Sequence, residues 1–228
     1  THPLVAGLTF ADGRKIDTGE LPSTKLMVSP RLGFNYDVKG DRSIQLRGGT
    51  GVFTGRIPFV WIVAQSGDAG MLQITQALNG QANTPIFSPD IKANYPSTLP
   101  AAGTFIPSSI SAMDKDLKFP STWKSSLAVD FKLPLGITAT FEGILNKDIN
   151  AVIAQNVNLV TPKALNVSGY PDNREIYPNP NVDKYINKLN SSGQASATNT
   201  GAFNSIVMKN AQGGNYYSAM IQLSKQFD

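Results

Sequence analysis

Two stretches of this chain alternate between apolar and polar residues with a period of two, and a short turn divides each of them. The first stretch covers residues 26–52 and turns at residues 39–42. The second covers residues 123–145 and turns at residues 134–136. Successive side chains of a strand point to opposite faces of a sheet. The pattern therefore predicts two hairpins, each with one apolar face and one polar face.

The polar face of the two hairpins carries charged side chains, whereas Leu, Val and Phe dominate the other face. We expect six charged residues to face the same way: Arg31, Arg47, Lys124, Asp130, Lys132 and Glu142. A membrane barrel turns its apolar residues toward lipid and its polar residues toward the lumen. These six residues are therefore candidates for a lumen-facing position. A large soluble antiparallel sheet with one solvated face also alternates, and it is the alternative.

The strands are long and their connections are unequal. Each alternating stretch covers about the 9–11 residues that a tilted strand needs to cross a bilayer, against about 5–6 in most globular strands. The two turns are short, whereas long connections are expected near residues 54–120 and 160–202. We therefore expect an all-β fold, namely a segment of an antiparallel transmembrane β-barrel. It would have about seven long strands, short periplasmic turns and long extracellular loops.

Two weaker patterns predict further strands near the ends of the chain. Residues 4–10 read as the end of one strand. Residues 203–209 and 216–227 read as a last hairpin, because a Gly-rich turn at residues 212–215 separates two alternating runs. Between the hairpins, the connection at residues 54–120 reads as irregular because it is rich in Gly, Pro, Asn and Ser.

The amino-acid composition of the chain limits the partners and the chemistry that we expect. Charged residues make up 16% of the chain, well below the ~25% of average soluble domains. The net charge is +4, but Lys and Arg are dispersed, so we expect no nucleic-acid partner. The sequence has no apolar stretch of the ~18 residues that a membrane helix needs. Cysteine is absent, which excludes disulfides and thiolate chemistry.

Residues suited to enzymatic chemistry are few. The single histidine, His2, makes a His-based triad or metal centre implausible. The Gly-rich run at residues 48–55 lacks the Gly-Lys-Ser/Thr ending of a phosphate-binding loop and reads as a strand. Asp130 and Glu142 share their face with Lys124 and Lys132, which favours a solvated wall of mixed charge over a catalytic acid pair. We expect no enzymatic activity, no cofactor and no metal.

An aromatic segment after the first hairpin is the best candidate for ligand contact. It contains Arg56, Phe59 and Trp61. Exposed aromatic residues beside an Arg are frequent anchors at binding surfaces. The alternative is that the segment packs within the loops or belongs to the rim of the barrel.

Several runs of this sequence resemble the barrel of TonB-dependent outer-membrane receptors, in particular the Bacteroidetes Oar-like group, which carries an N-terminal carboxypeptidase-regulatory-like domain. The runs are SPRLGFNYD at residues 29–37, QLRGGTGVFTGR at 45–56, FPSTWK at 119–124 and NKDINAV at 146–152. The resemblance implies a barrel of about 22 strands with a plugged lumen. Residues 1–228 would then be a partial barrel domain without the plug and the remaining strands, which agrees with the absence of an initial Met.

The resemblance also implies a location and partners. The location is the bacterial cell outer membrane, and the partners are outer-membrane lipid, an unknown extracellular ligand and the TonB complex, which the absent plug domain would contact. Unpaired strand edges favour self-association of the excised strands. The function expected first is binding and import of a ligand across the outer membrane. The alternatives are an outer-membrane surface receptor for adhesion or cell contact, and a soluble all-β binding domain.

Overall fold

The chain folds into two compact units. The computed structural model describes residues 1–73, 84–96, 98–177, 182–190, 195 and 201–227. The strand unit comprises Pro22–Ile57, Asp116–Ile153 and Lys209–Asp228, and the second unit comprises Thr1–Leu21, Pro58–Lys115 and Ala154–Met208. Parts of the two long connections expected near residues 54–120 and 160–202 lie outside the described residues.

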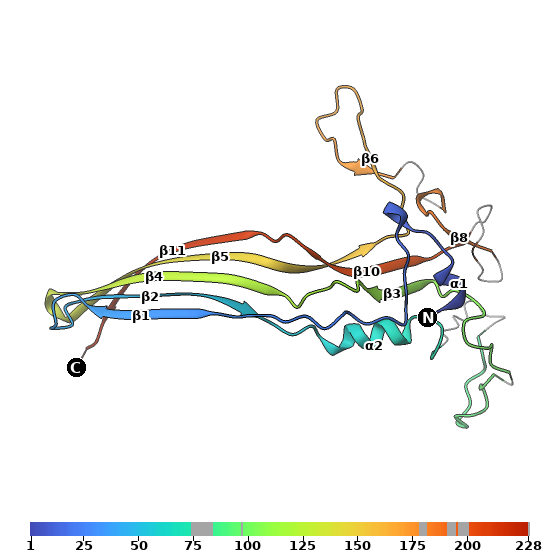
Figure 1. Ribbon diagram of the computed structural model, residues 1–228, viewed down its shortest axis with the longest axis horizontal. Coiled ribbons are helices and arrows are strands. Elements are labelled where there is room, and N and C mark those ends of the chain that lie inside the picture. Colours follow the sequence, from blue (N-terminus) through green and yellow to red (C-terminus); the bar gives the residue numbers. More distant parts are fainter. Residues whose placement is uncertain (74–83, 97, 178–181, 191–194, 196–200, 228) are drawn as a thin grey trace. The chain divides into compact units, whose positions relative to one another are not determined.

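Five long strands make up most of the strand unit and lie side by side in Figure 1. They are β1 (Arg31–Asp37), β2 (Ile44–Thr54), β4 (Ser121–Leu133), β5 (Ile137–Asn156) and β11 (Asn215–Lys225). Neighbours pair antiparallel in the order β1-β2-β4-β5-β11. Both hairpins expected from the alternation are present, and the all-β fold is confirmed. The sheet is not closed, because β1 and β11 each have one strand neighbour among the described residues.

Short turns close the two hairpins, as expected. Between β1 and β2, the Asp37 carboxylate accepts hydrogen bonds from the backbone N–H groups of Gly40 and Arg42, each at 2.9 Å. Hydrogen bonds from the Ser43 side chain and backbone lower the pKa of Asp41 in the same turn. Between β4 and β5, a 3-10 turn covers Pro134–Gly136.

The first strand is shorter than the alternation predicted. It begins at Arg31 and not at residue 26, and Leu26 is 94% exposed. Pro30 marks the boundary because proline has no N–H to donate to a neighbouring strand. Its carbonyl oxygen still accepts a hydrogen bond from the backbone N–H of Val52. The chain before Pro30 keeps its alternation without forming a strand of the sheet.

The prediction of a last hairpin at residues 203–227 is wrong. β10 (Asn204–Ala211) and β11 both pair with β5, one after the other along its length. The Gly-rich residues between them do not reverse the chain, and the backbone N–H of Asp148 on β5 donates to the Gly214 oxygen at 3.1 Å. A Cβ atom at Gly213 would lie 2.0 Å from the Cβ atom of Asp148. Glycine therefore permits a close approach here, where the sequence pattern indicated a turn.

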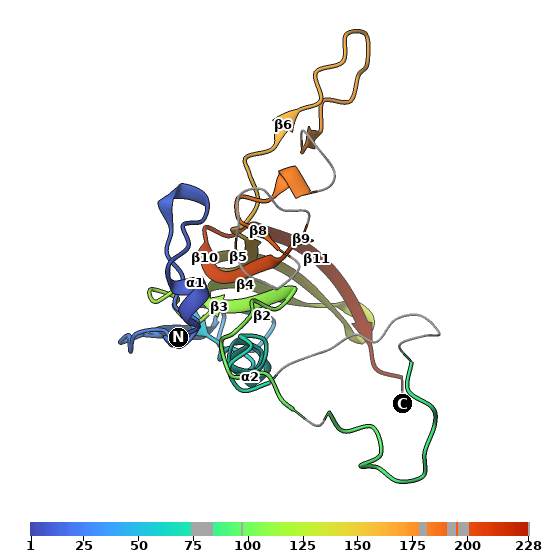
Figure 2. The same ribbon diagram turned by 90° about the vertical axis from the view of Figure 1, so that its right-hand side faces the viewer.

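The second unit is mixed in structure and corrects two further expectations. Residues 4–10 are not a strand, because α1 covers Pro3–Ala6 and a 3-10 turn follows at Ala11–Gly13. The connection after the first hairpin is not irregular throughout, since it contains helix α2 (Phe59–Gly67) and strand β3 (Ser109–Met113), which pairs parallel with β10. Short elements complete the unit: β6 (Lys163–Ala164), β7 (Glu175–Ile176), η3 (Val182–Lys184), β8 (Lys188–Leu189) and β9 (Gly201–Ala202). Figure 2 shows the hairpin that carries β6 projecting away from β8 and β9.

The second unit has its own hydrophobic core. Its buried members are Val5, Phe10, Ile16, Ile106, Ile110, Ala112, Val157, Leu189, Phe203 and Val207. Phe10 and Phe203 meet edge to face with ring centroids 6.3 Å apart, a favoured geometry for aromatic pairs. Segments distant in the sequence are thus held together by apolar burial.

A buried asparagine ties three segments of this unit together. The Asn158 side chain is fully buried, and its amide nitrogen donates to the carbonyl oxygens of Asn187 and Phe203 at 2.9 and 3.0 Å. Its amide oxygen accepts from the backbone and side-chain nitrogens of Asn187 at 2.9 and 3.0 Å. The amide nitrogen and the amide oxygen of Asn158 therefore each have two hydrogen-bond partners.

We expect Asn158→Ala to destabilise the second unit by about 2 kcal/mol, because it leaves the buried Phe203 carbonyl and backbone groups of the half-buried Asn187 without these partners. Hydrogen exchange of the full-length protein should show faster exchange around residues 156–159 and 185–189. Asn173→Ala is the matched control, since Asn173 accepts one exposed hydrogen bond from Asn166 and should cost less than about 0.5 kcal/mol. Equal exchange rates in the two variants would contradict the role given to Asn158.

Candidate functional site

The strand register places the six candidate lumen residues on one face of the sheet, here called the polar face. Arg31 on β1 and Lys124 on β4 both pair with Gly51 on β2. Arg47 pairs with Ala128, and Ala128 in turn pairs with Glu142. Asp130 and Lys132 pair with Thr140 and Thr138. Directly paired residues share a face of a sheet. That this face lines a lumen stays a prediction.

In one part of the polar face, a basic and an acidic side chain form a salt bridge. The Arg47 guanidinium on β2 donates to the Asp130 carboxylate on β4 at 2.9 Å, and the Thr140 hydroxyl on β5 donates to the same carboxylate at 2.6 Å. Three neighbouring strands are thereby cross-linked through one carboxylate. Charge-assisted hydrogen bonds of this kind are short and strong, and they fix the side chains that make them.

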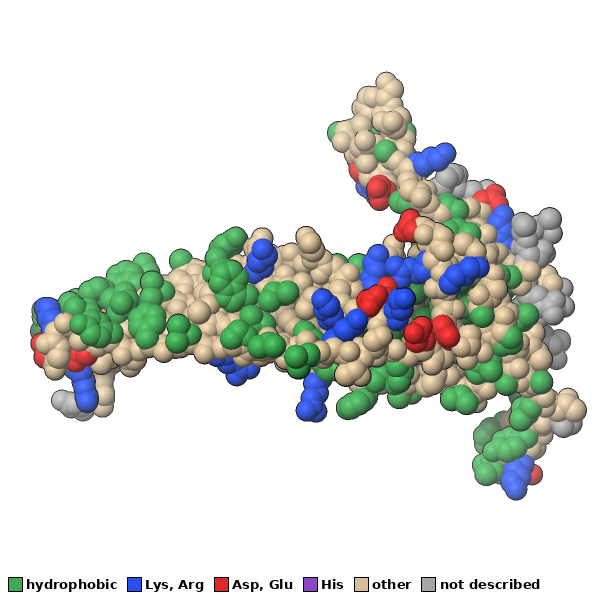
Figure 3. Space-filling model, in the orientation of Figure 1, with side chains coloured by type: hydrophobic (Ala, Val, Ile, Leu, Met, Phe, Trp, Pro, Cys, Tyr) green, Lys and Arg blue, Asp and Glu red, His purple; other side chains and the backbone are tan. Residues whose placement is uncertain are grey.

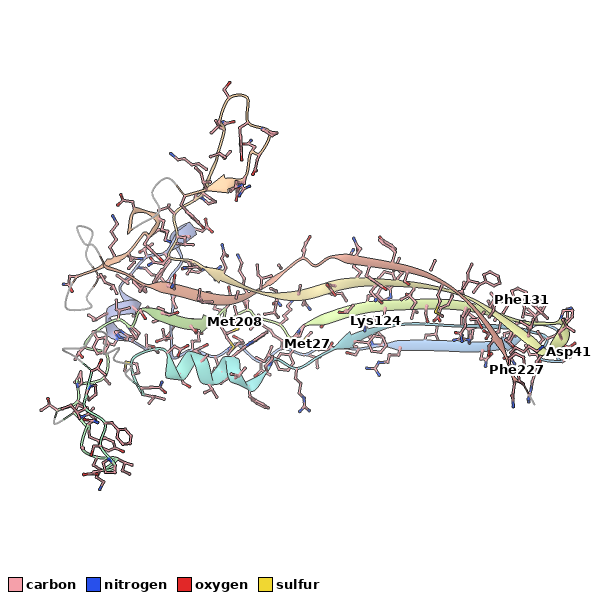
Figure 4. All side chains as sticks on the ribbon, turned by 180° about the vertical axis from the view of Figure 1, so that it is seen from behind. Met27, Asp41, Lys124, Phe131, Met208 and Phe227 are labelled. Atoms are coloured by element: carbon pink, nitrogen blue, oxygen red, sulfur yellow. The ribbon has the colours of Figure 1, made fainter. Side chains whose placement is uncertain are left out.

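Another part of the polar face holds two cations beside an aromatic ring. The Arg31 guanidinium carbon lies 4.4 Å from the ring centroid of Phe53, and the Lys124 ammonium nitrogen lies 5.8 Å from the same centroid. The salt bridges among the described residues do not include Arg31 or Lys124. Figure 4 labels Lys124 on β4, away from the turn end where Phe131 and Asp41 are labelled. The sequence interpretation missed Phe53, although its parity with Arg47 placed it on this face.

The opposite face, here called the apolar face, is continuous across all five strands. Leu127, Val129 and Phe131 share it with Phe141 and Leu145, as the alternation predicted. The register extends it over the following residues: Leu32, Phe34, Tyr36, Ile44, Leu46, Tyr217, Ala219, Ile221 and Leu223. Leu127 is 52% exposed and Ile221 is 71% exposed, so this face is largely open. Figure 3 shows hydrophobic side chains gathered over the strands.

The height of the apolar face fits a bilayer. On β4 the apolar residues run from Trp123 to Leu133. At ~3.3 Å per residue this stretch is about 33 Å long, and a strand tilt of roughly 40° reduces it to about 25 Å along the membrane normal. Outer-membrane barrels have an apolar band of about this height, flanked by aromatic residues. Trp123 and Tyr217 lie at the end of the band away from the turns.

Polar atoms on the apolar face satisfy one another. The Trp123 indole N–H donates to the Thr50 hydroxyl at 2.7 Å, and the hydroxyls of Thr50 and Ser125 are hydrogen-bonded at 2.7 Å. A polar group that faces hydrocarbon without a partner costs several kcal/mol, so such internal pairing is a requirement in lipid. Ser125 interrupts the apolar pattern in sequence, and this network explains how it is tolerated.

The candidate ligand-contacting residues fall into two units. Arg56 is exposed in the strand unit, whereas Phe59 and Trp61 belong to α2 of the second unit. Phe59 is 76% exposed, and Trp61 is partly buried. The helix is held by Gln65, whose amide donates to the Glu20 oxygen at 2.6 Å and accepts from the Met113 N–H at 2.9 Å. Ligand contact by Arg56, Phe59 and Trp61 stays a prediction.

The described part of the chain lacks two features that define other protein classes. There, three or more His, Asp or Glu side chains do not gather in any place where they would hold a metal ion. Helices long and apolar enough to cross a membrane are likewise not found among the described residues.

A long antiparallel sheet with one exposed apolar face of bilayer height and one polar face is the wall of a membrane β-barrel. Comparison with known families agrees: the chain belongs to the family described as the outer membrane beta barrel domain, whose sequence model matches residues 4–228. Its location is therefore the bacterial outer membrane. Comparisons with curated proteins and with solved structures gave no match.

Proposed function

We propose that this chain is part of a TonB-dependent receptor that binds a ligand outside the cell and imports it across the outer membrane. The observation that supports the proposal most is the charged polar face, with its Arg47–Asp130–Thr140 network, behind a lipid-facing apolar face. A wall of this kind lines a route for polar solutes. The finer assignment to TonB-dependent import is supported by the sequence resemblance of residues 29–37, 45–56, 119–124 and 146–152.

The proposal requires further strands. The smallest bacterial outer-membrane barrels have about eight strands, and larger transporters have about 22. The described sheet has seven, and three of them, β3, β5 and β10, have residues in the second unit. We therefore infer that β1 and β11 pair with other strands in the assembled barrel. In isolation these two edges would favour self-association of the chain.

The proposed partners follow from this role. Outer-membrane lipid covers the apolar face, and an extracellular ligand binds to the long connections. The TonB complex acts through a plug domain. We propose that the chain captures a solute and lets it pass, which requires no enzymatic chemistry and no cofactor.

A second candidate function is a surface receptor for adhesion or cell contact. The observation that favours it is that the second unit builds its own hydrophobic core around Phe10 and Phe203 and presents a projecting hairpin. A folded module of this kind offers a surface for contact without transport.

An uptake experiment separates the two functions. Cells with and without the gene for the full-length protein are given radiolabelled iron chelates, oligosaccharides and peptides, and a strain without TonB is measured in parallel. Import predicts that at least one solute accumulates about tenfold less in both deletion strains, because passage depends on energised transport. Unchanged accumulation together with a loss of surface attachment would overturn import in favour of adhesion.

A further inference from the structure

We propose that Arg31, Lys124 and Phe53 form a binding site for an anionic group of the transported ligand, a carboxylate or a phosphate. The inference deepens the proposed function and rests on it, because it takes the polar face as the lumen wall. Three observations carry it: the placement of the two cations, the absence of a salt bridge to either of them among the described residues, and the glycine between them.

The register sets the spacing of the two cations. Arg31 on β1 and Lys124 on β4 are both paired with Gly51 on β2, so they lie at the same height on either side of one strand. Neighbouring strands are ~4.8 Å apart, which separates their Cα atoms by about 10 Å. Both cationic groups lie within 6 Å of the Phe53 ring centroid, at 4.4 and 5.8 Å. Both therefore lie beside the same ring, and we infer that a single anionic group can meet both.

Gly51 leaves room for this arrangement. A Cβ atom at this position would lie 2.9 Å from the Arg31 Cγ atom. The aliphatic part of Arg31 thus lies over the glycine, toward the strand that carries Lys124. A larger residue at position 51 would push the guanidinium away from the ring.

The other charges of the polar face do not neutralise this pair. Arg47 is neutralised by Asp130, and the Asp37 carboxylate accepts backbone N–H groups of its own turn. The acid nearest to Lys124 in the register is Asp148, which follows the paired Asn146 by two positions on β5. The Asp148 carboxylate accepts a hydrogen bond from the Thr122 hydroxyl at 3.0 Å and makes no salt bridge with Lys124.

Two cations beside one ring, with no salt bridge to either in the described part of the chain, attract an anion, and the aromatic ring orients them. Arginine binds carboxylate and phosphate groups through two parallel N–H donors, and lysine adds a point charge. The site thus selects ligands that carry a negative group. It lies on the polar face at the level of Trp123, toward the aromatic end of the apolar band.

The test measures anion binding by the purified full-length protein in detergent, which needs no uptake and so can fail independently of import. Inorganic pyrophosphate and succinate are titrated by calorimetry at low salt as probes of phosphate and carboxylate. Wild type is expected to bind at least one of them. Substitution to R31Q and K124Q together should weaken that binding about tenfold or more, and each single variant about threefold.

Lys132→Gln is the matched control, because it removes one cation from the same face without touching Phe53. It should change binding less than about twofold. Phe53→Leu should weaken binding by about two- to fivefold through loss of the cation–aromatic contacts. Absence of binding to wild type, an equal loss in K132Q, or unchanged binding in both R31Q and K124Q would overturn the site. If the double variant does not fold, the two single variants decide.

Discussion

Leu127→Arg is expected to lower the free energy of unfolding of the membrane-inserted protein by about 2–4 kcal/mol. Leu127 lies on the apolar face close to midway between Trp123 and Leu133, near the middle of the band that we place in the bilayer. An arginine there must either enter hydrocarbon or bend toward the interface, and both outcomes cost free energy. The measurement is urea unfolding of the full-length protein folded into lipid vesicles, followed by tryptophan fluorescence.

Ser126→Arg is the matched control, because Ser126 precedes Leu127 and faces the opposite way. On the polar face an arginine stays in water, so the expected loss is less than about 1 kcal/mol. A soluble sheet with a solvated apolar face would tolerate both changes to a similar degree. Equal losses in the two variants would therefore contradict the assignment of the apolar face to lipid.

Gly213→Val is expected to cost about 3 kcal/mol, because overpacking at this point displaces one strand from another. A Cβ atom at Gly213 would lie 2.0 Å from the Asp148 Cβ atom and 3.1 Å from its Cα atom. Since a Cβ atom is fixed by the backbone, side-chain rotation cannot relieve the contact. Separation of β11 from β5 should appear as a lower yield of folded protein in vesicles and as a lower urea midpoint.

Gly214→Val separates this contact from a general demand for glycine in the segment. A Cβ atom at Gly214 would meet no atom within 4 Å, so we expect a change below about 1 kcal/mol. If residues 212–215 formed a hairpin turn instead, substitution at either glycine would be costly. Comparable losses at Gly213 and Gly214 would thus restore the hairpin interpretation.

The hairpins and their faces were predictable because period-two alternation reports directly on which side of a sheet a residue occupies. Leu127 and Asp130 could be assigned to opposite faces without knowledge of their neighbours. The short turns were predictable for a similar reason: Gly40 and Pro134 lie between two alternating runs, where the chain must reverse.

Other features depended on contacts distant in sequence. Gly213 and Gly214 are compatible with a turn or with a close approach of strands, and only the position of Asp148 decides between them. In the same way, α2 is stabilised by Gln65, whose partners Glu20 and Met113 are remote from it in the chain. Local propensity could not distinguish that helix from the irregular connection around it.

The cationic site illustrates the same limit. Arg31, Phe53 and Lys124 each had the parity of the polar face, but parity does not say which residues on different strands are neighbours. The register through Gly51 supplies that information. Similarly, Ser125 looked like an interruption of the apolar face until its hydrogen bond with Thr50 was known.

Site-directed spin labelling of the full-length protein in lipid vesicles tests the central claim most directly. Residues 1–228 contain no cysteine, so single cysteines introduced at residues 126–131 can be labelled without background from this part of the protein. We predict that nitroxides at positions 127, 129 and 131 are relaxed mainly by oxygen dissolved in lipid. Those at 126, 128 and 130 should be protected from oxygen and more accessible to a water-soluble nickel chelate. Loss of this period of two, or nickel access on the apolar side, would contradict the account of these strands as the wall of an outer-membrane barrel.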